Sequence, residues 1–198
     1  MKQKTYILIG RSGCGKDTQL RLIEDRLKEL DPGRKIIDLK TGESLREYWG
    51  EEGYANDLSR EINNKGLLQP EFLVIYLWGK KLIEKIRGNE HLIFDGSPRR
   101  LSEAKVLESA LRFFKRDEPT VIYLNVSRQW SIDRLTGRGR DDDTVEQINQ
   151  RLDWFGEYVT PALDYLKNNK RYKFVDINGE QTIEKVFEEL VEKVGLEE

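Results

Sequence analysis

The stretch YILIGRSGCGKDTQ, residues 6–19, decides how this 198-residue chain folds. Its first four residues are apolar and predict a strand that is buried on both faces. The chain then turns through Gly10, Gly13 and Gly15, which permit backbone angles and close approaches that a Cβ would block. From Lys16 onward, apolar residues recur at helical spacing. The stretch therefore predicts a buried strand, a glycine-rich turn and an amphipathic helix.

A glycine-rich turn between a strand and a helix is suited to holding phosphate. Consecutive backbone N–H groups can point at one anion, and the start of the helix adds a partial positive charge. Lys16 would reach the terminal phosphates as a point charge. The alternative is an ordinary turn that is rich in glycine, and the lysine that follows the three glycines argues against it. We expect a phosphate-binding loop.

One position departs from the general pattern, which has Ser or Thr directly after the lysine. Here Asp17 takes that place and Thr18 follows. A carboxylate beside a bound triphosphate is repelled unless it points to solvent or joins the shell of a magnesium ion. Cys14 lies in the same turn, and we expect its thiol to react with alkylating reagents when no nucleotide is bound.

The composition excludes several classes of protein. Acidic and basic residues nearly balance, with a net charge of −2, so nothing indicates a nucleic-acid partner. No apolar run approaches the roughly 20 residues of a membrane span, and the first strand begins too early to leave room for a signal peptide. One cysteine excludes an internal disulfide and a cysteine-rich zinc site. We expect one cytoplasmic domain without a membrane partner.

Five apolar segments predict strands, and helical patterns separate them. The expected strands are residues 6–9, 35–39, 91–95, 120–126 and 172–177. Such alternation predicts a parallel sheet with helices on both faces. The helix after Pro70 is expected to bury Phe72, Ile75, Tyr76, Gly79, Leu82, Ile83 and Ile86. A long helix between residues 148 and 166 is expected to bend at Pro161.

The segment HLIFDGSPRR, residues 91–100, predicts a second functional stretch. Asp95 stands at the carboxyl end of a buried strand, which is the edge where ligands bind in such sheets. A carboxylate there can hold magnesium through water molecules. Gly96 and Pro98 shape a rigid turn, and Arg99 offers a planar fork that matches phosphate oxygens in pairs.

These stretches together resemble the adenylate kinase family of nucleoside monophosphate kinases. The loop is similar to the family's G-x-P-G-x-G-K-G-T-Q, residues 40–46 to its S-T-G-D-x-L-R, and residues 95–99 to its D-G-F-P-R. Residues 134–143 are similar to its R-x-x-x-R and G-R-x-D-D, and Arg151 follows Arg140 by eleven residues as in the family. Any one of these arginines alone would be read as a solvated surface residue. The likeness spans nearly the whole chain.

The resemblance implies a P-loop NTPase-type, five-stranded parallel α/β sheet formed by residues 1–198 as one domain. Within it, residues 42–69 would form a small helical insertion that binds the monophosphate, and residues 136–143 a vestigial lid. The implied reaction moves the γ-phosphoryl group of Mg-ATP to a nucleoside monophosphate, and Thr41 favours AMP. The implied cofactor is Mg²⁺ and the partners are small-molecule nucleotides. We expect a monomer, with an oligomer as the alternative.

The resemblance also assigns roles to residues. Those expected to bind ATP are Gly13, Cys14, Gly15, Lys16, Asp17, Thr18, Arg134, Arg138 and Gln181. Those expected to bind the acceptor are Thr41, Arg46, Leu67, Leu68, Gln69, Gly96, Ser97, Pro98, Arg99, Glu103, Arg140 and Arg151. The charge for catalysis would come from Lys16, Arg99, Arg138, Arg140 and Arg151. Magnesium would lie near Thr18 and Asp95.

Three departures from the family pattern leave alternatives open. Gln69 stands where the family has valine, and Glu103 where adenylate kinases place a glutamine that reads the acceptor adenine. A carboxylate only accepts hydrogen bonds, so the acceptor could be GMP or a pyrimidine monophosphate instead. Only Gly139 separates Arg138 from Arg140, where the family inserts its lid. The chain could also be a non-catalytic nucleotide sensor, although binding ATP alone gives no use to Arg99.

Overall fold

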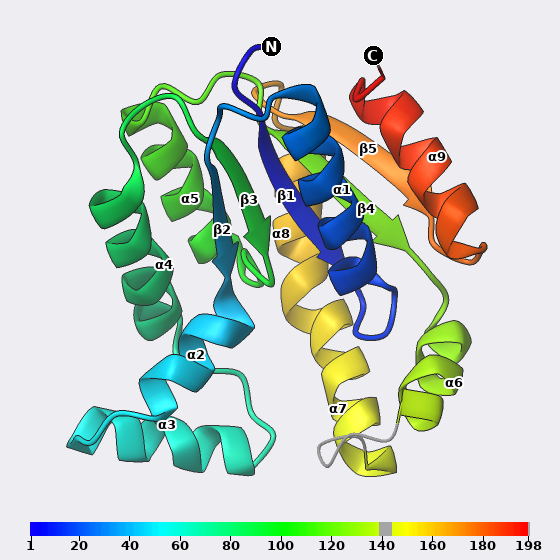
Figure 1. Cartoon of the computed structure of the whole chain (residues 1–198). Helices are drawn as coiled ribbons and strands as arrows, with labels where there is room; N and C mark the ends of the chain where they lie inside the picture. Colours follow the sequence, from blue (N-terminus) through cyan, green and yellow to red (C-terminus); the bar gives the residue numbers. More distant parts are fainter. Residues whose placement is uncertain (139–143, 198) are drawn as a thin grey trace.

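The apolar segments form one parallel sheet, in the order β2–β3–β1–β4–β5 (Figure 1). The computed structural model describes residues 1–138 and 144–197. The strands are β1 (Thr5–Gly10), β2 (Ile36–Lys40), β3 (His91–Asp95), β4 (Thr120–Asn125) and β5 (Lys173–Asn178). Each predicted strand is confirmed, with ends displaced by at most one residue. Because all the strands are parallel, their carboxyl ends meet at one edge of the sheet.

Helices cover both faces of this sheet, as expected from the alternating pattern. The helical segments are α1 (Lys16–Leu30), α2 (Thr41–Trp49), α3 (Tyr54–Asn64), α4 (Glu71–Lys85), α5 (Leu101–Phe113), α6 (Arg128–Arg138), α7 (Val145–Trp154), η1 (Phe155–Val159), α8 (Thr160–Asn168) and α9 (Ile183–Val194). One apolar cluster joins a sheet face to α4, α5, η1 and α8. A second joins the opposite face to α1 and α9. Figure 1 shows α2, α3, α6 and α7 beyond the carboxyl edge, where they surround the predicted site.

The buried face of α4 differs from the predicted one. Phe72 and Ile83 are 71% and 73% exposed, and Tyr76 is also exposed. The residues of α4 that are buried are Leu73, Val74, Trp78 and Leu82. The prediction is confirmed for Leu82, and Ile75 and Ile86 pack against the core. It was wrong for the exposed residues because residues 72–78 read FLVIYLW, which is apolar on every side of a helix. Periodicity alone therefore cannot choose the face that packs.

The long helix predicted between residues 148 and 166 forms as α7, η1 and α8 in direct succession. Its irregularity is the π-helical turn Phe155–Val159, which ends two residues before Pro161. The Thr160 backbone N–H donates to the Phe155 carbonyl, five residues back. A wide turn of this kind locally re-aims the side chains of a helix. The irregularity of this helix is thus a π turn before Pro161, and the bend expected at Pro161 itself stays a prediction.

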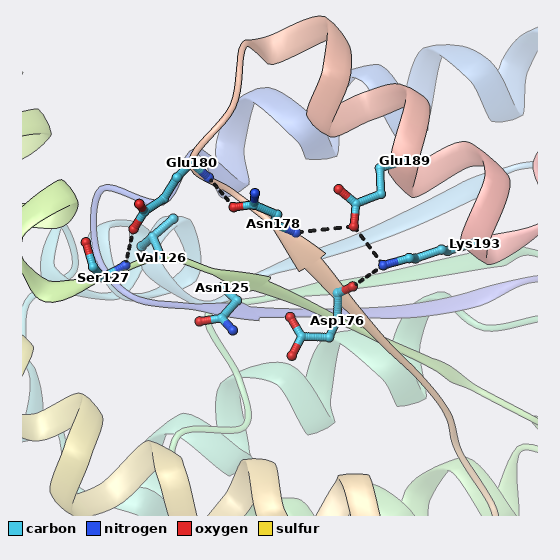
Figure 2. Close-up of a pocket in the computed structure, with 8 residues that line it drawn as sticks. All are labelled: Asn125, Val126, Ser127, Asp176, Asn178, Glu180, Glu189 and Lys193. Carbon is cyan, nitrogen blue, oxygen red and sulfur yellow. Dashed lines mark hydrogen bonds and ion pairs between the residues drawn. The ribbon is translucent and has the colours of Figure 1, made fainter.

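One edge strand of the sheet, β5, is contacted by polar side chains of α9 (Figure 2). Lys193 Nζ donates to the Asp176 carbonyl at 2.7 Å, and the Asn178 N–H donates to Glu189 Oε1 at 3.3 Å. Lys193 and Glu189 also pair with each other at 2.7 Å. They line a pocket of about 500 Å³ whose other residues are Asn125, Val126, Ser127, Asp176, Asn178 and Glu180. The Asp176 carbonyl and the Asn178 N–H of this edge are thus engaged by the protein itself.

Among the described residues, no helix is both long and apolar enough to cross a membrane.

Candidate active site

The glycine-rich loop forms the turn that the sequence predicts. Gly15 stands at the N-cap of α1 with a φ of 92°, and Gly13 has a φ of 83°. L-residues with a Cβ rarely adopt such angles, so both positions favour glycine. Lys16 Nζ donates to the Gly10 carbonyl at 2.7 Å and to the Arg11 carbonyl at 3.1 Å. The ammonium group therefore lies across the loop, on the side where a phosphate would enter.

Cys14 is buried under the loop, where its Sγ atom accepts from Lys16 Nζ at 3.6 Å. Its side chain is 5% exposed and belongs to the apolar cluster beneath α1 and α9. The expectation of a reactive thiol is therefore wrong, because the turn directs this side chain into the core. What residue 14 can offer to a phosphate is its backbone.

The two residues after Lys16 remain at the surface. Asp17 and Thr18 are both exposed in the first turn of α1. The Asp17 carboxylate therefore points to solvent, which is one of the two orientations expected for it. The Thr18 hydroxyl is accessible to a ligand at the helix start.

Asp95 is the buried acid of the site. It ends β3, and its neighbours in register are Leu8 on β1 and Lys40 on β2. Burial raises the pKa of its carboxyl group, the charge of Lys16 lowers that pKa, Asp17 raises it and Arg99 lowers it. Its Oδ1 atom is buried without a hydrogen-bond partner. A buried, unpartnered carboxylate oxygen at this edge suits a magnesium-bound water molecule.

The turn after β3 directs an arginine fork outward. Gly96 has a φ of 80°, the Ser97–Pro98 peptide bond is cis, and both residues of that bond are buried. Arg99 is exposed, and its Nε atom donates to the Gly96 carbonyl at 2.9 Å. The rest of the guanidinium remains accessible to solvent. The predicted position of Arg99 at the sheet edge is therefore confirmed.

Thr41 joins this turn to the start of α2. Its hydroxyl group lies 2.9 Å from the Ser97 hydroxyl, and both side chains are buried. A Cβ built on Gly96 would lie 3.5 Å from Thr41 Cβ and 3.4 Å from Arg99 Nη2. The segment that the resemblance assigns to acceptor recognition thus touches the turn that carries Arg99. Arg46, one turn further along α2, is exposed, with its Nη1 atom close to Gly42.

Glu103 and Gln69 are both turned into the protein, contrary to the expectation that each faces the acceptor base. Glu103 is 2% exposed, and its Oε2 atom accepts from the Arg99 backbone N–H at 2.8 Å. Burial raises the pKa of the Glu103 carboxyl, and the hydrogen bond from Arg99 lowers it. Gln69 is buried and bonds to Ser59. Both side chains hold local structure in the described protein.

The insertion reaches the helix that carries Arg151. A Cβ on Gly66, which follows α3, would lie 2.8 Å from Gln150 Oε1 on α7. Leu67 is 47% exposed beside this contact, and Leu68 is half-buried. Arg151 is half-buried on α7, where its Nε atom donates to the Gln147 carbonyl at 3.2 Å.

The remaining predicted arginines lie on or beyond α6. Arg134 is exposed, and its guanidinium lies 5.0 Å from the centre of the Trp130 ring. Arg138 ends α6, and its side chain is outside the described part of the structure. Arg140 and residues 139–143 of the expected lid segment are outside it as well.

The turn after β5 packs against the phosphate loop through Gly179. A Cβ there would lie 2.6 Å from Val126 Cγ1 and 3.7 Å from the Cys14 carbonyl oxygen, so only glycine fits. Gln181 Nε2 donates to the Asn178 carbonyl at 3.0 Å and to Glu189 at 2.7 Å. The side chain of Gln181 therefore supports the turn, which places its backbone beside the loop.

Comparison with known proteins now assigns this arrangement. A model of the adenylate kinase family matches residues 8–171. The chain belongs to the adenylate kinase family. Adenylate kinase of Azobacteroides pseudotrichonymphae is 32% identical over 191 residues, which cover 94% of this chain and 95% of that protein. Adenylate kinase 1 of Nostoc sp. and adenylate kinase of Encephalitozoon cuniculi are each 31% identical, over 96% of this chain and 97% of theirs.

As a member of the adenylate kinase family, the chain is a phosphotransferase that uses ATP with a nucleoside monophosphate. The family assignment agrees with the sheet and with the glycine-rich loop after β1. Two residues of this chain that shape its candidate site were missed by the sequence analysis. Arg11 crosses from the loop to the end of β4, and Gly179 permits contact with that loop. For Arg11, the sequence shows only that a large cation follows Gly10 in the loop.

Proposed function

We propose that this protein catalyses the transfer ATP + AMP = 2 ADP. The observation that carries the proposal is Asp95, whose Oδ1 oxygen is buried without a hydrogen-bond partner and whose pKa is raised by burial and lowered by the charges of Lys16 and Arg99. The cation expected on the ATP phosphates and the cation expected on the acceptor phosphate thus both act on one acid at the carboxyl edge of the sheet. A protein that binds only ATP has no need of the second cation.

The chemistry requires position and charge more than proton transfer. An acceptor phosphate oxygen is already ionised at neutral pH, so no general base is needed. The loop and Lys16 hold the ATP phosphates, while Arg99 and Arg46 hold the acceptor phosphate. Arg151, with Arg138 and Arg140, supplies charge where negative charge spreads over the transferring group. In this proposal Lys16 leaves the loop carbonyls to which it now donates.

Asp95 and Thr18 are the residues that would hold magnesium, Asp95 through bound water. When bound, the ion neutralises phosphate charge and orients the β- and γ-phosphates. Among the described residues, no group of three or more His, Cys, Asp or Glu could hold a metal ion on its own.

AMP is the acceptor we favour, because Thr41 lies beside the Arg99 turn and the relatives above are adenylate kinases. A second candidate is another monophosphate, which Glu103 favours because a carboxylate cannot donate to the adenine ring nitrogen. In the structure, however, Glu103 is buried and accepts from the Arg99 N–H, so it does not face a base, and AMP remains the acceptor we favour.

The test is a coupled assay of ADP formation from ATP with AMP, GMP, CMP and UMP in turn. We expect AMP to give the highest kcat/KM. Glu103→Gln should leave the preference for AMP unchanged, because the buried side chain accepts from the Arg99 N–H and does not face the base. A higher kcat/KM with another monophosphate would replace AMP as the acceptor. Absence of transfer to any of the four would overturn the proposed function.

A further inference from the structure

Arg11 is a cation of the phosphate loop that the preceding reaction does not use. It follows Gly10 at the end of β1 and is partly buried. Its Nη1 atom donates to the Val126 carbonyl, just beyond β4, at 2.8 Å. Its guanidinium carbon lies 4.7 Å from the centre of the Phe155 ring. One side chain therefore connects the loop to a neighbouring strand and to η1.

Phe155, whose ring lies under Arg11, also contacts a residue of the sheet. Phe155 is 5% exposed and stacks on Tyr123 of β4, with ring centres 6.4 Å apart and planes 16° apart. Burial raises the pKa of the Tyr123 phenol, and the charge of Arg11 lowers it, as expected for close neighbours. Arg11, Tyr123 and Phe155 thus form one contact group between the loop, the sheet and η1.

Phe155 is also continuous with the helix that carries Arg151. It begins η1 directly after α7 and lies four residues after Arg151. A guanidinium over an aromatic face is attractive, and its planar fork can donate to a carbonyl at the same time. The distance between the ATP-binding loop and the Arg151 helix is therefore set by a direct bridge. No closing motion is needed to establish it.

We infer that Arg11 is a positioning residue for phosphoryl transfer, which fixes helix α7 and its Arg151 relative to the phosphate loop before nucleotide binds. This inference rests on the proposed function, since it concerns the same transfer. It matters most in this chain because only Gly139 separates Arg138 from Arg140, so a long lid cannot bring arginines inward. A displacement of about 1 Å can lower a rate on the order of 10²-fold.

The first experiment separates turnover from binding. Arg11→Ala should lower kcat for ATP plus AMP by about 10- to 100-fold and change both KM values by less than about threefold. Arg11→Lys keeps the charge over the ring but not the fork, and should recover part of kcat. Phe155→Leu removes the ring and should also lower kcat, as Arg11→Ala does. The double variant should be no worse than the poorer single one, because both act through one contact.

The second experiment does not depend on activity. In nucleotide-free Arg11→Ala, amide hydrogen exchange in residues 145–159 should be faster than in the unaltered protein by about fivefold, the factor for one cation–π contact. Residues 183–194 of α9 should exchange at the same rate in both. Lys167→Ala is the matched control. Lys167 belongs to α8, and its Nζ atom lies 5.7 Å from the centre of the Phe174 ring on β5, so it makes a similar contact away from the loop. It should change neither exchange in residues 145–159 nor kcat.

Equal exchange of residues 145–159 in Arg11→Ala and the unaltered protein would overturn the inference. So would a raised KM for ATP with unchanged kcat, because Arg11 would then be a ligand of ATP. If the unaltered protein transfers phosphate to none of the four monophosphates, the proposed function fails, and the exchange comparison still decides whether Arg11 positions α7.

Discussion

Gln69 holds Ser59 through both ends of its side-chain amide. The Ser59 hydroxyl donates to Gln69 Oε1 at 2.7 Å, and Gln69 Nε2 donates to the Ser59 carbonyl at 2.9 Å. Trp49 Nε1 donates to the same hydroxyl at 2.7 Å, so α2, α3 and the segment before α4 meet at one buried point. Gln69, which the sequence predicted to bind the acceptor, therefore stabilises the insertion.

Gln69→Val should destabilise the protein without changing its choice of acceptor. The substitution leaves the buried Ser59 groups without this partner, which lowers the free energy of unfolding by about 1–3 kcal/mol. Urea unfolding measures this, and the ratio of kcat/KM for AMP to that for CMP should stay the same. Gln129→Val, on an exposed residue of α6, should leave stability nearly unchanged. An intact stability with an altered ratio would return Gln69 to the base site.

Arg99→Ala should lower turnover by 10² or more, on the order of 3 kcal/mol in activation free energy, if Arg99 grips the acceptor phosphate. The fold should persist, because the guanidinium is exposed and, among the described residues, donates a hydrogen bond to the Gly96 carbonyl alone. Circular dichroism and the unfolding midpoint check the fold, and steady-state kinetics check the rate. Activity close to that of the unaltered protein would remove Arg99 from the site.

His91 should make the fold sensitive to mild acid. It is fully buried, accepts from the Lys4 backbone N–H through Nδ1, and burial lowers its pKa from 6.5 to about 4. Between these values the unfolded chain binds the proton and the folded one does not. The contribution of His91 to stability is therefore whole above pH 6.5, falls as pH drops from 6.5 to 4, and stays at its lowest value below that.

The loss from His91 should reach about 2 kcal/mol at pH 5. The measurement is urea unfolding at pH 7 and pH 5 for the unaltered protein and for His91→Asn, whose side-chain oxygen can still accept from Lys4. The difference between the two proteins isolates His91 from other titrating groups, such as Asp38, whose pKa burial raises to about 6. The same pH dependence in both proteins would contradict the assignment.

The Cys14 thiol should react slowly with iodoacetamide in the folded protein. Burial keeps the reagent away, so labelling should require unfolding and should track the fraction unfolded in urea. Saturating ATP should slow it only through ligand stabilisation of the fold. Fast labelling in the folded protein that ATP abolishes directly would show that the thiol faces the nucleotide.

ATP hydrolysis without an acceptor should be measurable in this chain. Since so short a segment joins Arg138 to Arg140, we expect it not to exclude water from the γ-phosphate. The assay compares phosphate release without AMP and transfer with AMP, in this chain and in one carrying a long lid grafted in place of residues 136–143. Leakage that is absent, or that the graft leaves unchanged, would mean that another part of the protein seals the site.

The sequence predicted the sheet, the loop after β1 and the position of Asp95 and Arg99 well, because each depends on short-range signals. Apolar runs bounded by glycine define parallel strands, and strand ends place their neighbours at one edge. What it could not predict were choices of partner. Whether Glu103 faces a base or the Arg99 N–H, and which side of α4 packs, depends on segments distant in sequence. Arg11 was overlooked because its partners, Val126 and Phe155, lie more than 100 residues away.

The α9 cover on β5 also bears on how this protein meets other molecules. A free sheet edge invites strand addition from a second chain, which leads to swapped dimers or aggregates. Here Lys193 and Glu189 occupy backbone groups that an incoming strand would need. Addition of a strand at the carboxyl end of β5 is therefore disfavoured.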